Sequence, residues 1–484
     1  MKRVVAGVDT STQSCKVEFR SFPDFKLVAA GAAPHPPASP PRSEQSPKAW
    51  WDAFVLAFRG ALAAAPDVEV IAISVAGQCH GLVPLDAERQ VIRPAKLWND
   101  TTSDGELQKL IAEVGANAFI ERTGSLPTAA FTISKVAWLV ANEPENAARM
   151  ATMLLPHDYL TFRLTGEFVT DRSEASGTGY FDAARNEYVF DFLRCISPEL
   201  PWEAMVPRVA GHDEVVGLVS TKSAEQLGIR PGALVGAGGG DQHASAVGLG
   251  LVAAELCVAL GTSGVVFSPS SEPVRDPSGL INGVAAMQGG FLPLACTLNA
   301  TRVTDTFARL LGVDHKELAH LALGADNNGP VLVPFLDGER TPNRPSATGL
   351  LADITAETSR EQLARASFEG VVFGLRTCVN LLEDAGVQTS GPVLVVGGGA
   401  RSQAYTQFLA DALDRSVHVA DTEQAVARGA ALQALAITSG QPLVELMQNH
   451  RPARRELATP RLNPGDRWAR YQQAASIKTL DKAP

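Results

Sequence analysis

Alternating apolar and polar positions dominate the start of the chain. An apolar run over residues 4–8 leads into a polar turn over 9–14, and residues 15–20 then alternate between apolar and polar side chains. A period of two is typical of a half-buried strand. We therefore predict a strand, a hydroxyl-rich turn and a second strand, with a third strand over 26–32.

A helical period replaces this alternation further along. The Pro-rich segment 34–41 has no regular period and is predicted to be a surface connection. Ser46 and Pro47 then open a predicted helix, because proline is favoured in the first helical turn. The apolar positions that recur along it at helical spacing are Trp50, Trp51, Phe54, Val55, Phe58 and Leu62. A strand over 70–75 follows and leads into the turn 77–81.

The second half of the chain repeats the opening pattern. Residues 256–268 again show a strand, a Thr/Ser turn and a strand. The apolar run 393–396 leads through three glycines into a predicted helix over 402–413. A strand over 416–420 and an Ala-rich helix from residue 423 follow. Two halves that open alike indicate a duplicated α/β fold with its ligand in the cleft between the halves.

Size and composition fit this organisation. At 484 residues the chain is too long for one ordinary core, and we predict domains 1–248 and 249–484, with a polar, peripheral piece after about Asn463. A hydrophobic content of 45% with 19% charged residues is typical of a globular protein. The net charge of −10 argues against nucleic acid or an anionic membrane as the main partner.

The spacing of the cysteines and the lengths of the apolar runs indicate which cellular compartment to expect. The six cysteines are scattered with no CxxC pair, which disfavours a zinc site or a disulfide framework and suits a reducing cytoplasm. The first residues lack the apolar core of a signal peptide. No apolar run reaches the roughly 18 residues that a membrane span needs. A cytoplasmic location is expected, and the oligomeric state, a homodimer included, stays open.

One carboxylate follows a glycine turn at the end of an apolar strand. Residues 238–240 are three glycines, and Asp241 and Gln242 come directly after them. Glycine lets the backbone approach a ligand closely, and a carboxylate at such an edge suits a general base that takes a proton from a hydroxyl. The competing interpretation is a turn whose aspartate caps the next helix.

Two hydroxyl turns and one more glycine turn are candidates for binding a nucleotide. Backbone N–H groups and small hydroxyls both donate to phosphate oxygens, and Asp9 at a strand end could hold Mg²⁺, which prefers oxygen ligands. The competing interpretation is two ordinary hairpins. The candidates on the phosphate side are Thr10, Ser11, Thr12, Lys16, Gly261, Thr262 and Ser263. Gly397, Gly398 and Gly399, followed by Ser402, could let a flat base lie against backbone, although neither a P-loop nor a dinucleotide fingerprint is present.

A polar and aromatic set in the first half has the side chains that hold sugars. Amides, carboxylates and imidazoles bind hydroxyls, and aromatic rings cover carbon atoms. The members are Gln78, His80, Trp98, Asn99 and Asp100. Taken singly, His80 or Trp98 is more often structural, and Lys16 or Arg340 is more often a solvated cation than a phosphate contact. The pair His157-Asp158 has no nucleophile predicted beside it.

Together these motifs resemble the FGGY family of carbohydrate kinases over roughly residues 3–445. The motifs that carry the resemblance are the Asp9 turn, Val75-Ala-Gly-Gln-Cys-His-Gly81, Leu97-Trp-Asn-Asp100, Gly238-Gly-Gly-Asp241, Leu260-Gly-Thr-Ser-Gly264, Gly338-Glu-Arg-Thr-Pro342 and Gly397-Gly-Gly-Ala-Arg-Ser402. The resemblance implies two ribonuclease-H-like (actin-like ATPase) domains flanking a catalytic cleft, with sugar bound mostly by the first and ATP by the second.

The resemblance also implies roles for individual residues. Asp241 corresponds to the catalytic base, Asp9 to the aspartate linked to Mg²⁺, and Gly397–Gly399 to the glycines beside adenine. Within the family the motifs are most similar to members that phosphorylate D-xylulose, which implies that Cys79 and His80 contact a ketopentose.

Two departures leave alternatives open. Ser11 stands where the family usually has glycine, so it either supplies a hydroxyl or narrows the turn. Gln242 stands where asparagine is common, and a glutamine at this position is similar to the pattern of glycerol kinases. Ribulose, glycerol or another polyol therefore stay as alternative substrates. A non-catalytic sugar or nucleotide sensor and a chaperone-type ATPase are further alternatives on the same fold.

Overall fold

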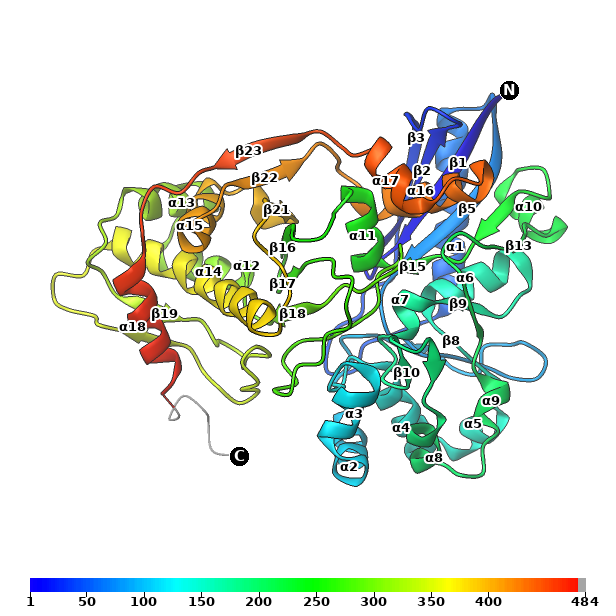
Figure 1. Ribbon diagram of the computed structural model, residues 1–484, viewed down its shortest axis with the longest axis horizontal. Coiled ribbons are helices and arrows are strands. Elements are labelled where there is room, and N and C mark those ends of the chain that lie inside the picture. The colour runs from blue at the N-terminus through cyan, green and yellow to red at the C-terminus, as the bar shows by residue number, and fades with distance from the viewer. Residues whose placement is uncertain (478–484) are drawn as a thin grey trace. The chain divides into compact units, whose positions relative to one another are not determined.

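The chain forms two compact units in a computed structural model that describes residues 1–477 (Figure 1). Unit 1 comprises residues 1–250, 283–291 and 422–452, and unit 2 comprises the remaining described residues, 251–282, 292–421 and 453–477. Each unit is built on one mixed sheet with helices packed on it.

The sheet of unit 1 follows the predicted opening pattern. Its strand order is β13-β14-β5-β1-β2-β3, with β15 pairing β5. The strands are β1 (Lys2–Thr10), β2 (Ser14–Ser21), β3 (Leu27–Pro34), β5 (Val68–Gly77), β13 (Val215–Leu218), β14 (Leu234–Gly236) and β15 (Gly239–Gly240). β1, β2 and β3 form an antiparallel meander, whereas β5 is parallel to β1 and β14 is parallel to β5.

The sheet of unit 2 has the same strand order and directions, although its antiparallel edge strand follows its neighbour in the chain, whereas β13 precedes β14. Its order is β18-β17-β16-β21-β22-β23. The strands are β16 (Leu256–Leu260), β17 (Gly264–Phe267), β18 (Leu294–Thr297), β21 (Val393–Val396), β22 (Val417–Ala420) and β23 (Arg454–Ala458). A meander is again followed by two parallel strands and an antiparallel edge strand. The duplicated α/β fold predicted from the sequence is therefore confirmed.

Helices cover both faces of the sheet in unit 1. Alternate side chains of β1, such as Val4 and Val8, pack with α1, while Val5 packs with α16. The principal helices are α1 (Pro47–Ala64), α6 (Pro156–Thr165), α10 (Thr221–Leu227), α11 (Asp241–Leu249), α16 (Ala425–Ser439) and α17 (Leu443–Asn449). Figure 1 shows α16, in orange, beside the blue strands of unit 1.

Smaller elements complete unit 1 between residues 44 and 210. The short strands pair as β4 (Glu44–Gln45) with β7 (Ala95–Lys96), β6 (Val83–Leu85) with β8 (Thr152–Leu154), β9 (Val169–Asp171) with β12 (Arg208–Ala210), and β10 (Phe181–Asp182) with β11 (Glu187–Tyr188). The helices are α2 (Asp104–Val114), α3 (Ala116–Thr123), α4 (Thr132–Asn142), α5 (Pro144–Arg149), α7 (Arg172–Ala175), α8 (Phe190–Ile196) and α9 (Trp202–Met205).

The close approach of α16 places it in unit 1, whereas the predicted domain 249–484 included it. A Cβ on Gly7 of β1 would lie 1.9 Å from the carbonyl oxygen of Ala427, and a Cβ on Gly429 would lie 1.9 Å from that of Ala244 in α11. Glycine at both positions lets backbone touch backbone. Small residues far apart in the chain therefore fix α16 on β1 and α11.

The C-terminal helix of unit 2 corrects another prediction. The segment after Asn463 was expected to be peripheral, but α18 (Gly465–Ala475) buries Arg467 and Tyr471 against the core of unit 2. The Arg467 guanidinium donates to Glu369 and to the carbonyl of Gly329. Pairing with a carboxylate lets a charged side chain be buried, so polarity alone was misleading. Residues 478–484 of that predicted piece lie outside the described residues.

The remaining elements of unit 2 frame its sheet. They are α12 (Thr301–Leu311), α13 (His315–Gly324), β19 (Val331–Val333), β20 (Leu350–Ala352), α14 (Arg360–Asp384), the 3₁₀ turn η1 (Gly398–Arg401) and α15 (Gln403–Leu413). All six cysteines are free thiols. Within residues 1–477, no helix is long and apolar enough to cross a membrane.

Candidate active site

The carboxyl ends of three neighbouring strands meet at one edge of unit 1. Asp9 in β1 is level with Ala76 in β5, and Gly239 in β15 is level with the same residue. The predicted residues Gln78 and Asp241 come directly after β5 and β15. In open α/β sheets ligands bind outside the carboxyl ends of strands, so this edge brings three predicted site residues together.

Asp241 is the first residue of α11 and is half-buried. Its Oδ1 accepts a hydrogen bond from the backbone N–H of Gln242 (2.7 Å) and one from the thiol of Cys79 (3.3 Å). Burial, together with the nearby charge of Asp9, raises the pKa of Asp241 to about 6. The carboxylate is thus ionised at neutral pH, yet it is more basic than an ordinary aspartate, as a general base requires.

Ser11, which departs from the family pattern, contacts the Asp9 carboxylate in the turn after β1. Asp9 Oδ1 accepts from the backbone N–H of Ser11 (3.1 Å) and from its hydroxyl, while Oδ2 lies 3.7 Å from Lys16 Nζ. Burial raises the pKa of Asp9, although the Ser11 hydroxyl and Lys16 oppose that shift. The Ser11 hydroxyl therefore holds one oxygen of the carboxylate and leaves the other facing a cation.

The side-chain amide of Gln78 has no hydrogen-bond partner in the part of the chain that the structure describes. Its backbone N–H donates to the carbonyl of Thr10 (3.1 Å), which ties the turn after β5 to β1. The side chain is only 1% exposed, and neither its nitrogen nor its oxygen forms a hydrogen bond with any described residue. Buried polar atoms are nearly always paired, so this amide is suited to a bound ligand.

The turn positions the His80 ring by several contacts. His80 has a φ of 64°, its N–H donates to Glu174 Oε2 (3.1 Å), and its ring stacks on Phe131 with centroids 5.2 Å apart. A Cβ on Gly177 would lie 2.0 Å from the ring atom Cε1. The absence of a side chain at Gly177 therefore leaves the space that the ring occupies.

The Trp98 loop joins residues predicted for different ligands. The indole N–H of Trp98 donates to Thr12 Oγ1 (2.9 Å), so a predicted sugar contact lies beside a predicted phosphate contact. Trp98 is 38% exposed and Asn99 is partly exposed, whereas Asp100 is fully buried. The Asp100 carboxylate accepts from the backbone N–H of Ser43 (2.8 Å), among other donors. The Asp100 carboxylate therefore anchors the loop, and its contact with substrate stays a prediction.

Thr10 also has an internal partner. Its hydroxyl lies 3.2 Å from His35 Nε2, and it is 1% exposed. Burial lowers the pKa of His35 to about 4, so this imidazole is neutral at neutral pH. The Thr10 hydroxyl therefore holds the buried base of the turn through His35. Ser11 and Thr12 are partly exposed at the tip of the turn.

A buried charged cluster lies in unit 1 beneath this edge. His157 Nε2 is 3.3 Å from both Asp158 Oδ1 and Asp171 Oδ1. Burial alone would lower the pKa of His157, but the two carboxylates raise it to about 9. His157 and Asp158 are fully buried. The three side chains thus form a buried ion cluster.

The predicted nucleotide turns of unit 2 also meet at one edge. β16 and β21 are parallel, so the turn Gly261–Ser263 and the glycines from Gly397 follow neighbouring strand ends. Gly397 has a φ of 89°, and a Cβ there would lie 2.6 Å from the Leu260 carbonyl oxygen. Gly398 is exposed with open space above it. The glycines thus present bare backbone next to the hydroxyl turn.

Ser402 and Arg340 have different surroundings. The Ser402 hydroxyl accepts from the backbone N–H of Tyr405 (3.5 Å) and caps α15. The backbone N–H of Arg340 donates to the buried carboxylate of Glu339 (2.8 Å), which also accepts from Asn299 (2.9 Å). Ser402 therefore has a local role in starting the helix, and Glu339 fixes the loop that carries Arg340.

Sequence reasoning missed three residues at the edge of unit 1: Glu174, Gly177 and His243. Glu174 and His243 lie near Cys79 on different elements, so no local spacing could connect them. The Ser- and Gly-rich run 173–179 was the available signal, since such runs often mark close backbone approach. Burial raises the pKa of Glu174 to about 8, which keeps this carboxyl largely protonated at neutral pH.

The duplicated sheet topology is that of the actin-like ATPase fold. Residues 4–248 match the N-terminal domain of the FGGY family of carbohydrate kinases, and residues 256–437 match its C-terminal domain. The chain belongs to this family and is a sugar kinase, as the resemblance implied.

Individual relatives agree with this assignment. The chain is 43% identical to a xylulose kinase from Streptomyces coelicolor over 90% of this chain and 89% of that protein. It is 35% identical to a xylulose kinase from Escherichia coli over 84% of both. The solved structure of a xylulose kinase from Bifidobacterium adolescentis is 36% identical and superposes with a TM-score of 0.86, covering 98% of this chain and 100% of that one.

Proposed function

We propose that this sugar kinase transfers phosphate from ATP to a terminal hydroxyl of D-xylulose and forms D-xylulose 5-phosphate. The observation that carries the proposal is the half-buried carboxylate of Asp241, with a pKa raised to about 6, beside the Cys79–His80 turn. The xylulose kinases similar to this chain support the choice of sugar. The six free thiols suit the reducing cytoplasm that we propose as its location.

Asp241 is proposed to accept the proton of the attacking hydroxyl. Phosphoryl transfer depends on positioning and charge neutralisation more than on covalent chemistry. The unpartnered amide of Gln78 and the ring of His80 would bind sugar hydroxyls, and the exposed ring of Trp98 would cover carbon atoms. The exposed backbone of Gly397 and Gly398 would accommodate adenine, and the Gly261–Ser263 turn would donate to phosphate oxygens.

The residues at the Asp9 turn fit a bound Mg²⁺. Asp9 offers a carboxylate oxygen at a strand end, next to the hydroxyls of Ser11 and Thr12, and hard cations prefer oxygen ligands. Mg²⁺ held there would neutralise phosphate charge. Lys16, whose side chain is 37% exposed, lies close enough to share that task.

Replacing Asp9 with asparagine should weaken the use of Mg·ATP more than it weakens sugar binding. Because the charge of Asp9 raises the pKa of Asp241, the same change should also move the acidic limb of kcat/KM to lower pH. Initial rates across Mg²⁺ and ATP concentrations and across pH test both effects. Unchanged magnesium dependence together with an unmoved acidic limb would exclude a role for Asp9.

A panel of ketoses and polyols in a coupled ADP assay tests the substrate. D-Xylulose should give the highest kcat/KM. Gln242→Asn should change the ranking of the sugars, because it should alter the differences in transition-state free energy between them by roughly 1–3 kcal/mol, the usual range for one buried hydrogen bond. Ser402→Ala, far along the chain in unit 2, is the control and should leave the sugar ranking unchanged. A preference for ribulose or glycerol would favour the alternative that Gln242 suggests.

Gly177→Ala should displace the His80 ring and raise KM for the sugar about 10-fold or more, since a buried hydrogen bond is typically worth 1–3 kcal/mol. The added methyl would lie 2.0 Å from the ring, which can rotate away without unfolding the chain. Gly105→Ala, with open space around its position, is the matched control. Equal sugar KM values for the two variants would remove the His80 ring from the sugar site.

A binding protein without catalysis is the second candidate function. The protonated carboxyl of Glu174 and the neutral imidazole of His35 could serve binding alone, but a sensor has no need of a base such as Asp241. Sugar-dependent ADP formation separates the two functions directly.

A further inference from the structure

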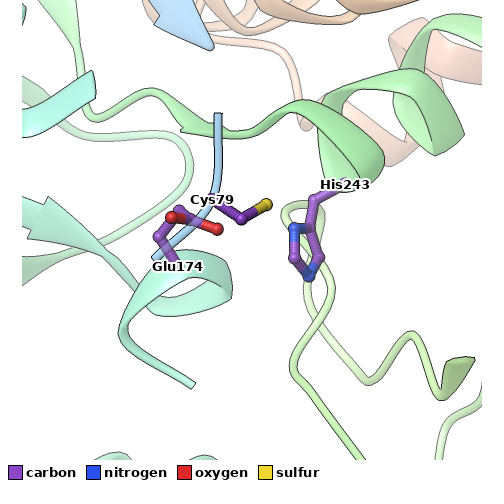
Figure 2. Close-up of side chains that lie close together, drawn as sticks. All are labelled: Cys79, Glu174 and His243. Atoms are coloured by element: carbon purple, nitrogen blue, oxygen red, sulfur yellow. The ribbon is translucent and has the colours of Figure 1, made fainter. Parts of the chain in front are cut away.

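Three potential metal ligands from three elements meet in unit 1. Cys79 follows β5, Glu174 lies in α7, and His243 lies in the first turn of α11. The sulfur, a carboxylate oxygen and a ring nitrogen all lie within 4.8 Å of one another. Figure 2 shows the Cys79 sulfur pointing toward the His243 ring, with the Glu174 carboxylate on its other side in this view.

Several of these ligand atoms have no hydrogen-bond partner among the described residues. Both ring nitrogens of His243 and Oε1 of Glu174 are buried and form no hydrogen bond within residues 1–477. His243 is 2% exposed and Glu174 is 0% exposed. Buried polar atoms are rarely left unpaired, so two side chains directed at one point suggest a missing ligand.

The space between the three side chains exists because residue 240 is glycine. A Cβ on Gly240 would lie 2.4 Å from Glu174 Oε1, 2.6 Å from His243 Nδ1 and 3.0 Å from Cys79 Sγ. The ligand atoms thus converge on the open side of this glycine. A larger residue would fill the space and separate them.

We propose that Cys79, Glu174 and His243 bind a divalent cation of the zinc class. Sulfur, imidazole nitrogen and carboxylate oxygen are the ligand types of Zn²⁺, and three protein ligands leave one position open for water. Mg²⁺ prefers octahedral oxygen ligands and is a poor match. A thiolate and a carboxylate balance the two positive charges, while the imidazole contributes a neutral lone pair.

Only small movements are needed to form such a site. Ligand atoms bound tetrahedrally at about 2.0–2.3 Å lie roughly 3.5 Å apart. The present atoms span up to 4.8 Å, so side-chain rotations of about 1 Å at the ligand atoms would close the group. The partly exposed Cys79 provides the path from solvent.

Occupancy should inhibit the kinase. Cys79 Sγ lies 3.3 Å from Asp241 Oδ1 and donates to it as a thiol, and a metal-bound thiolate cannot donate. The cation would also place positive charge beside the carboxylate that accepts the sugar proton. This consequence rests on the proposed role of Asp241, whereas binding of the cation does not.

Spectroscopic titration tests the binding without any substrate. Co²⁺ added to the chelator-treated full chain should give a thiolate-to-cobalt charge-transfer band that saturates at one equivalent and is displaced by Zn²⁺ but not by Mg²⁺. The band should be lost in Cys79→Ser. His243→Ala and Glu174→Gln each remove a proposed ligand. Loss of an outer-shell partner alone costs roughly 10–100-fold, so the affinity for Co²⁺ should fall by at least that factor in each variant.

Matched variants make the outcome decisive. Glu174→Gln keeps an acceptor for the His80 N–H, and circular dichroism confirms that each variant is folded. Cys195→Ser removes an exposed thiol and should retain the band. No band in the wild type, or a band that survives His243→Ala and Glu174→Gln but is lost in Cys195→Ser, overturns the proposal.

The kinase assay then tests the inhibition. Zn²⁺ at the concentration that displaces Co²⁺ should lower turnover at fixed, saturating Mg·ATP, and His243→Ala should resist it by the same factor as its loss of affinity. Binding without inhibition would contradict the role of Asp241 and leave the cation site intact.

Discussion

Asp241→Asn is expected to lose about 10²–10⁴-fold in turnover, the usual cost of removing a general base. The variant should fold normally, because the amide oxygen can still accept from the backbone N–H of Gln242 and from the thiol of Cys79. Sugar affinity should change little, since the other proposed contacts remain. Steady-state kinetics with direct measurement of sugar binding check the result, and near wild-type turnover would exclude Asp241 as the base.

The pH profile adds an independent test of the same residue. The folded-state pKa of Asp241 is raised to about 6, so the ionised base is present above that pH and is lost as the pH falls through it. The wild-type kcat/KM should therefore fall tenfold per pH unit below about 6. Asp241→Asn should lose this acidic limb, while Gln242→Asn should keep it.

Of the glycine-to-alanine substitutions that we propose, Gly429→Ala is expected to lower the free energy of unfolding the most. The new Cβ would lie 1.9 Å from the carbonyl oxygen of Ala244, and Gly248 of the same helix approaches Ala425 equally closely. Overpacking by side chains typically costs about 1–3 kcal/mol of unfolding free energy. Because the Gly429 clash is with backbone, backbone must move, and the loss of stability should reach or exceed that range. Urea unfolding followed by tryptophan fluorescence measures it.

Gly60→Ala is the matched control for this prediction. Gly60 lies in α1, is exposed, and has its nearest neighbour 3.9 Å from the added Cβ. Alanine in an exposed helix interior is favoured over glycine by up to about 1 kcal/mol. The two substitutions should therefore change stability with opposite signs, and equal effects would contradict the close helix crossing.

Local patterns predicted the strands and turns well. The alternation over residues 15–20 and the apolar run 393–396 correspond to β2 and β21. Strand ends are set by local alternation and turn residues, so Asp9, Gln78 and Asp241 could each be placed at the end of a strand from the sequence. That the three strands share one edge is shown by their pairing in the structure. The roles of these residues remain predictions.

Long-range packing was harder to predict. The helix from residue 423 was expected, but its position on β1 depends on glycines more than 400 residues apart, Gly7 and Gly429. The burial of Arg467 depends on Glu369, which lies 98 residues away in the chain. Partners of this kind leave no periodic signal in the sequence, which is why polarity suggested exposure.

The return of residues 422–452 to unit 1 has a consequence for biosynthesis. The sheet of unit 1 is complete by residue 240, yet the helix that covers β1 and α11 leaves the ribosome only after residues 251–421 have been made. At about 5–20 residues per second, that interval is roughly 10–30 s. During it the apolar faces around Val5, Ala72 and Val247 lack their cover, so the nascent chain should depend on chaperones until α16 arrives.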